Sequence, residues 1–243
     1  MNVKMLFRIL DKRAVIIYFI TISLLSLINT KDVSVIGILG GINTSKSIGA
    51  LDVFGVIKWN ICVLPPVAVS TLFMISEMGP ISKYTMSRSE SVKNWAATRF
   101  ISIIVANIFY LLAALIITSI FNFKIDVSSN LFYRLMVIFP LHTIMLSMLS
   151  IMLLAIYKTP KSVIITYLIV EGITAVIGCV LPSTSKFMLA YWGMAYNNNL
   201  LLSNSYFHFS IVISFMLMLT VLSIYITTKF FITNNPAANI INL

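Results

Sequence analysis

The sequence predicts an all-α integral membrane protein with six transmembrane helices and both termini in the cytoplasm. Of its 243 residues, 59% are hydrophobic and only 10% are charged, whereas a soluble domain carries about 25% charged residues. The apolar residues also fall into long runs, and a helix needs about 20 apolar residues to cross a bilayer. Six runs reach or approach that length: 14–29, 56–76, 100–121, 135–157, 162–181 and 209–228.

The distribution of basic residues predicts the orientation. Eleven of the 17 Lys and Arg residues fall in segments on the same side as the N-terminus, and six fall on the other side. Because basic residues accumulate in cytoplasmic loops, both termini are expected inside. Residues 33–57 are a weak candidate for a seventh span, but they contain Lys46, Asp52 and several glycines. We interpret this segment as an outer loop, and a partial dip into the membrane stays open. A true seventh span would reverse the side of the C-terminus. We attribute the net charge of +10 to the basic residues that orient the spans. No nucleic-acid partner is therefore expected.

Residues 1–13 predict an amphipathic helix on the inner membrane surface. Lys4, Arg8 and Lys12 recur every four residues and form one polar stripe, while Phe7 belongs to the apolar side. Such a helix lies in the plane of the interface. The alternative is a merely positive flank of the first span.

Residues 77–99 predict a rigid cytoplasmic segment between the second and third spans. Gly79 and Pro80 are breakers that end one helix, and Pro80 is acceptable at the start of the next. Ser87 and Glu90 have the spacing of a capping box, in which each side chain satisfies a backbone donor at a helix start. A helix can then run from Arg88 into the third span. A solvated, positively charged loop is the alternative.

Residues 182–208 predict an outer region that caps or re-enters the helix bundle. The segment holds Tyr191, Trp192 and Tyr196, aromatic residues of the kind found at headgroup level. It is too polar for a span, so we expect one or two short helices.

Four residues inside the predicted spans are candidates for a translocation path or gate. Glu171 lies near the middle of the fifth span, where a carboxylate costs roughly 2.5–3.5 kcal/mol and is expected to face the bundle or a water-filled path. His142 lies at a matching depth in the fourth span and is its plausible hydrogen-bond partner. Either the pair is structural or it lines the path. Pro65 and Pro66 are expected to kink the second span.

This layout resembles the permease subunit of ABC-2 type ABC exporters across most of the chain. The segment "TMSRSESVKNWAATRF" is similar to the stretch of such permeases that leads from the coupling helix into the third span. The small size is most similar to a Gram-positive group, the phenol-soluble modulin exporters and their relatives, which export peptide toxins or confer immunity to antimicrobial peptides.

The resemblance implies that residues 1–243 form a single transmembrane domain. It also implies a homodimer or heterodimer in the lipid bilayer, coupled to separate ABC ATPase subunits, that exports an amphipathic or hydrophobic peptide or a lipid-like substrate. The residues implied to couple to the ATPase are Pro80, Ile81, Ser82, Lys83, Tyr84, Met86, Ser87, Arg88, Glu90 and Lys93.

The chain contains no P-loop for binding ATP. The closest string, "GGINTSKS" at 40–47, has Ser45 where the motif requires its second glycine. ATP and Mg²⁺ are therefore expected in the partner subunit, and no cofactor, metal site or catalytic residue is expected in this chain. An intramembrane protease is disfavoured because no G-x-S-x-G or H-E-x-x-H string occurs. A membrane sensor or immunity protein without transport activity stays open, as does a secondary carrier, although no internal repeat is visible.

Overall fold

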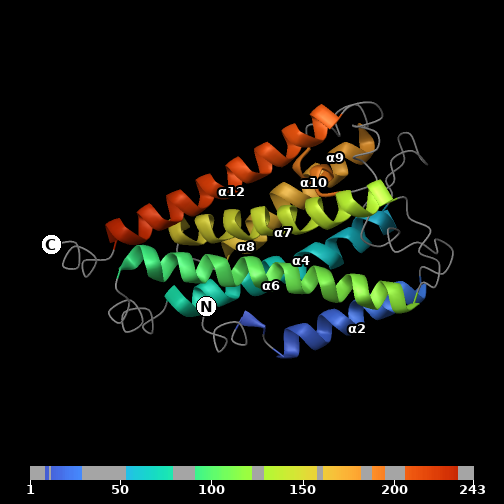
Figure 1. Ribbon diagram of the computed structural model, residues 1–243, viewed down its shortest axis with the longest axis horizontal. Coiled ribbons are helices and arrows are strands. Elements are labelled where there is room, and N and C mark those ends of the chain that lie inside the picture. Colours follow the sequence, from blue (N-terminus) through green and yellow to red (C-terminus); the bar gives the residue numbers. More distant parts are fainter. Residues whose placement is uncertain are drawn as a thin grey trace.

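A computed structural model of the chain is a bundle of long helices (Figure 1). It describes residues 9–10, 12–28, 53–78, 91–121, 129–157, 161–181, 188–194 and 206–234. Within these ranges the chain forms helices and no strand. The elements are α2 (Lys12–Ile28), α4 (Val53–Met78), α6 (Val92–Phe121), α7 (Ser129–Tyr157), α8 (Lys161–Thr166), the π-helix η2 (Tyr167–Ile173), α9 (Thr174–Val180), α10 (Leu189–Trp192) and α12 (Tyr206–Asn234).

Four of the described helices are long and apolar enough to cross a membrane. Their apolar stretches are Gly55–Glu77, Lys93–Phe121, Met136–Tyr157 and Ser210–Phe230. These helices coincide with the second, third, fourth and sixth predicted spans, and they are compatible with a multi-pass membrane protein. The all-α class is confirmed. The first predicted span corresponds to α2, which has 17 residues, and the fifth corresponds to the uninterrupted run α8–η2–α9.

The long helices alternate in direction along the long axis of the bundle (Figure 1). We call one end the Glu77 end, because α4 ends there and α6 begins there. The opposite end, where α9 and α10 lie, is the α10 end. Helix α7 is the central element and contacts α12, α4, α8 and α6, whereas α2 packs on α6 and α4.

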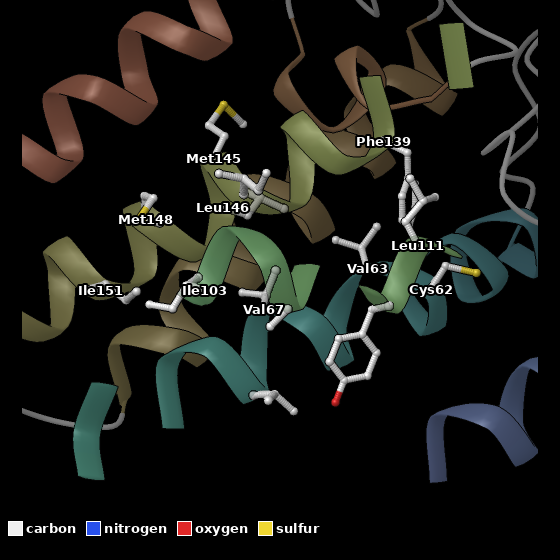
Figure 2. Close-up of a cluster of buried hydrophobic side chains, with 14 of the residues drawn as sticks. Cys62, Val63, Val67, Ile103, Leu111, Phe139, Met145, Leu146, Met148 and Ile151 are labelled. Atoms are coloured by element: carbon white, nitrogen blue, oxygen red, sulfur yellow. The ribbon is translucent and has the colours of Figure 1, made fainter. Parts of the chain in front are cut away.

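Buried apolar side chains fill the space between α4, α6 and α7. Figure 2 shows the central part of this core, with Cys62, Val63, Val67, Ile103, Leu111, Phe139, Met145, Leu146, Met148 and Ile151 labelled. On the outside of the bundle, large apolar side chains are exposed on α2, α6 and α12, among them Leu24, Ile116 and Val221. A surface this apolar is typical of a membrane-facing protein.

Both prolines of the second predicted span lie inside the continuous helix α4. A proline has no N–H, so Pro66 leaves the carbonyl of Cys62 without its helical donor. The hydroxyl of Tyr18 on α2 donates to that carbonyl at 3.4 Å, and the Tyr18 ring packs edge-on against Tyr110 of α6, with centroids 5.0 Å apart. A neighbouring helix therefore satisfies a backbone group that the proline frees.

The beginning of α6 differs from the sequence prediction. We expected a helix from Arg88, but the described helix begins at Val92. The Ser91 hydroxyl accepts the N–H of Asn94 at 3.1 Å, so Ser91 is the N-cap. Lys12 also differs: it was assigned to the interfacial helix and is instead the first residue of α2.

Several predicted residues lie outside the described part of the chain. They are Lys4, Phe7, Arg8, Pro80, Ile81, Ser82, Lys83, Tyr84, Met86, Ser87, Arg88, Glu90 and Tyr196.

Candidate functional site

The side chain of Glu171 points into the bundle and is held by two other helices. One carboxylate oxygen, Oε2, accepts the indole N–H of Trp59 on α4 at 2.9 Å. The other, Oε1, lies 2.5 Å from Nε2 of His142 on α7. All three side chains are fully buried. We call Trp59, His142 and Glu171 the buried triad.

A π-helix carries Glu171 into this position. Within η2, the residues Leu168, Ile169 and Ile173 are all more than half exposed, whereas Glu171 is the buried residue. The Thr174 hydroxyl donates to the carbonyl of Val170, which satisfies one backbone group of the widened turn. Short π segments are rare and occur frequently at functional sites.

The two oxygens of Glu171 have different partners in the buried triad. Oε2 accepts the indole N–H of Trp59, and Oε1 is hydrogen bonded to Nε2 of His142. The other ring nitrogen of His142, Nδ1, is buried and has no hydrogen-bond partner in the described part of the chain. The His142 ring also packs against Trp59, with centroids 6.0 Å apart.

Two further buried polar atoms come from the same turns as the buried triad. The side-chain oxygen of Asn60 and the hydroxyl of Tyr167 have no hydrogen-bond partner among the described residues. Asn60 follows Trp59 directly, and Tyr167 lies one turn before Glu171. Buried polar atoms are normally satisfied, so these two atoms have hydrogen-bonding capacity that no described residue uses.

A second polar contact connects α4, α6 and α7 within the core. The side-chain amide of Asn107 donates to the Ser70 hydroxyl at 3.0 Å and to the Ile103 carbonyl at 2.9 Å. The Ser147 hydroxyl of α7 donates to the Thr143 carbonyl of its own helix at 2.8 Å and lies 3.4 Å from Oδ1 of Asn107. The Asn107–Ser70 bond links α6 to α4, and Ser147 brings α7 to the same polar cluster.

An ion pair lies at the Glu77 end of the bundle. The Arg99 guanidinium donates to Oε2 of Glu77 at 3.0 Å from Nη2 and at 3.2 Å from Nε. It also lies over the Trp95 ring, 4.6 Å from its centroid. The Glu77 side chain is 2% exposed and that of Arg99 is 13% exposed. We call this contact the Glu77–Arg99 clasp, and it joins the last turn of α4 to the second turn of α6.

Among the described residues, the structure brings two of the sequence-predicted site residues into direct contact. His142 and Glu171 are hydrogen bonded, as their matching depth suggested. Pro65 and Pro66 lie on α4, in the two turns that follow Trp59. Lys93 is exposed in the first turn of α6. Whether these residues line a path or couple to a partner stays a prediction.

Sequence reasoning missed Trp59, Arg99 and Asn107 as members of these polar contacts. A depth comparison of the kind that paired His142 with Glu171 would not have found Trp59, because it is only the fourth residue of the predicted span 56–76. For Tyr191 the headgroup level stays a prediction, and the structure shows contacts that the sequence did not reveal. That side chain is 0% exposed, and its hydroxyl donates to the Ala175 carbonyl at 3.0 Å.

No protein-family model, no curated protein and no solved structure matches this chain.

Proposed function

We propose that the chain is the permease subunit of an ATP-driven ABC exporter. In this proposal the helices α2, α4, α6, α7, α8–η2–α9 and α12 are six spans, and both termini and the Glu77 end face the cytoplasm. The permease works as a dimer with separate ATPase subunits, and its substrate is an amphipathic or hydrophobic peptide or a lipid-like molecule.

The Glu77–Arg99 clasp carries the proposal. It holds together the two helix ends that flank residues 79–90, the segment that the sequence predicts to bind the ATPase. An ion pair with so little exposure is costly to break by removing one partner. A force applied between the two helices therefore reaches α4 and α6 together, which is what a coupling segment requires.

The buried triad supports a path through the bundle interior. Ionisable residues within membrane spans face the interior and frequently mark a substrate or ion pathway. The unsatisfied atoms of Asn60, Tyr167 and His142 provide polar contacts for a substrate that is largely apolar.

Co-purification with the ABC ATPase encoded nearest to this chain tests the proposal. The variant Arg88→Glu with Lys93→Glu reverses two charges in the predicted contact. Recovery of the ATPase and its stimulated ATP turnover are expected to fall about tenfold or more, because like charges across an interface cost several kcal/mol. The control is Lys161→Glu, an exposed residue at the start of α8, which should leave both quantities unchanged. Equal recovery and turnover for the double variant and the wild type would refute the coupling role.

A proton-driven secondary carrier is the second candidate, and the His142–Glu171 contact favours it. Buried histidine–carboxylate chains serve as proton relays in pumps and carriers. Inside-out vesicles separate the two functions, with a fluorescent amphipathic helical peptide as the probe. Uptake that requires ATP hydrolysis supports the exporter, whereas uptake driven by an imposed proton gradient alone supports the carrier.

A further inference from the structure

The short helix α10 lies against the span that carries Glu171. Tyr191 of α10 packs on Gly178 of α9, and a Cβ added to Gly178 would lie 2.2 Å from the Tyr191 ring. Only a glycine leaves room for this ring. The Tyr191 hydroxyl donates to the Ala175 carbonyl, and the backbone N–H of Ala190 lies 3.4 Å from the Thr174 hydroxyl oxygen that accepts it.

The residue that follows α10 covers a member of the buried triad. A Cβ on Gly193 would lie 2.5 Å from both Cγ and Cδ2 of His142, so the Gly193 backbone rests directly on the imidazole ring. On its other side, α10 reaches α12, where the Trp192 and Phe215 rings have centroids 6.1 Å apart. The segment thus extends from α9 to α12 and passes over His142.

Tertiary contacts hold α10 in place. It has four residues, and a helix this short has no stability of its own. Its position therefore depends on contacts with its neighbours, among them the Tyr191 and Ala190 hydrogen bonds, two glycine contacts and the Trp192–Phe215 ring contact. Substitutions that remove these contacts should unseat the segment.

We propose that α10 together with Gly193, residues 189–193, is a lid that closes the buried triad at the α10 end of the bundle. With the lid seated, the His142 ring is covered and the triad is closed to solvent. With the lid lifted, the His142 ring and its unsatisfied Nδ1 become accessible from that end. Only the side of the membrane to which the lid opens rests on the proposed function. In the exporter, the lid opens to the outside and regulates release of the substrate.

Cysteine accessibility tests the lid without any transport assay. The reporter is Ala190→Cys in a background of Cys62→Ala and Cys179→Ala, since Ala190 is a fully buried residue of α10 itself. A membrane-impermeant maleimide applied to intact cells should label this cysteine slowly in the otherwise unchanged chain and completely after denaturation.

Two glycines on the same span provide the variant and its matched control. Gly178→Ala forces the Tyr191 ring out of its seat and should raise the labelling rate about tenfold or more, since overpacking of this kind is destabilising. Gly172→Ala should leave the rate unchanged, because a Cβ there meets nothing within 4 Å. Tyr191→Phe, which removes only the hydrogen bond to Ala175, is the milder second variant and should raise the rate by a smaller factor.

The outcomes separate the lid from the proposed function. Fast labelling of Ala190→Cys in the unchanged chain overturns the lid, and so do equal rates for Gly178→Ala, Tyr191→Phe and Gly172→Ala. Labelling that increases as expected, but only in inverted vesicles, supports the lid and contradicts the orientation. The labelling needs no ATPase, so a chain with a working lid that binds no ATPase refutes the exporter alone.

Discussion

Replacing Trp59 by Phe isolates one bond of the buried triad. The substitution removes the indole N–H that donates to Glu171 at 2.9 Å. It keeps an aromatic ring beside Phe139, whose centroid lies 5.5 Å from that of Trp59. Because Glu171 is fully buried, no bulk water replaces the lost donor.

The magnitude follows from two opposing effects. A hydrogen bond to a charged group contributes about 1.5–3 kcal/mol in proteins. Interhelical hydrogen bonds in membranes average only about 0.6 kcal/mol and reach about 1.7 kcal/mol, since polar groups also find partners in the unfolded state within the bilayer. Glu171 is buried and keeps His142 as a second partner, so we expect a coupling free energy of about 1 kcal/mol between Trp59 and Glu171.

A double-mutant cycle measures this coupling. The four proteins are the wild type, Trp59→Phe, Glu171→Met and the double variant, unfolded at equilibrium in mixed micelles with increasing dodecyl sulfate. Far-UV circular dichroism is the readout, because tryptophan fluorescence changes with the substitution itself. The cavity left by the smaller ring and the unpaired His142 cancel in the cycle.

The control cycle uses Trp192→Phe, which removes an indole that packs on Phe215 of α12. Its coupling with Glu171→Met should be zero within about 0.5 kcal/mol, the usual limit of additivity. A Trp59–Glu171 coupling no larger than that of the control would show that the carboxylate is not held by the indole.

Two further predictions concern the clasp and the π-helix. Arg99→Gln leaves the nearly buried Glu77 without this cation, and we expect the free energy of unfolding to fall by about 2 kcal/mol. Adding Glu77→Gln should recover part of that loss. Equal thermal midpoints of the wild type and Arg99→Gln in detergent would contradict the clasp. Deletion of Ile169 from η2 should be tolerated, because a π segment contains a residue more than an α-helix of the same rise, whereas deletion of Val176 from α9 should abolish monodisperse expression by turning the following residues about 100°. Equal yields of the two deletion variants would show that η2 holds no spare residue.

The apolar runs predicted most of the helices correctly. In a bilayer each backbone N–H and C=O must be satisfied within its own segment, so a long apolar run has few alternatives to a helix. This constraint acts along the chain and is visible in composition. It accounts for the agreement of α4, α6, α7 and α12 with the predicted spans.

The start of α6 could not be read from the sequence because the local signals are degenerate. Serines occur at 87, 89 and 91, and each is an acceptable N-cap. The Ser87–Glu90 pair has the better capping-box spacing, yet Ser91 bonds the N–H of Asn94. Where the helix begins also depends on tertiary contacts such as the one between Glu77 and Arg99. These two residues lie 22 positions apart, so a local sequence pattern does not contain this contact.

The His142–Glu171 contact was predictable in depth and not in direction, and Trp59 was not predicted. Counting residues from helix ends gives a height in the membrane, which is why His142 and Glu171 could be paired. The direction in which a side chain points depends on the helical register. The π turn around Glu171 shifts that register, and no local sequence pattern predicts the shift. The burial of Tyr191 has a similar cause, since it depends on the missing Cβ of Gly178, a residue 13 positions away in the sequence.

Helix α4 connects the two ends of the bundle, and its contacts suggest how motion would pass between them. Trp59 near one end is bonded to Glu171, and Glu77 at the other end is bonded to Arg99. Pro65 and Pro66 lie between these contacts and remove two helical hydrogen bonds, so bending there costs less than elsewhere in the helix. A displacement of the Glu77 half of α4 can therefore be taken up at the prolines while the Trp59–Glu171 bond stays intact. In the exporter that we propose, the prolines would let the cytoplasmic half respond to the ATPase before the buried triad or its lid has to move.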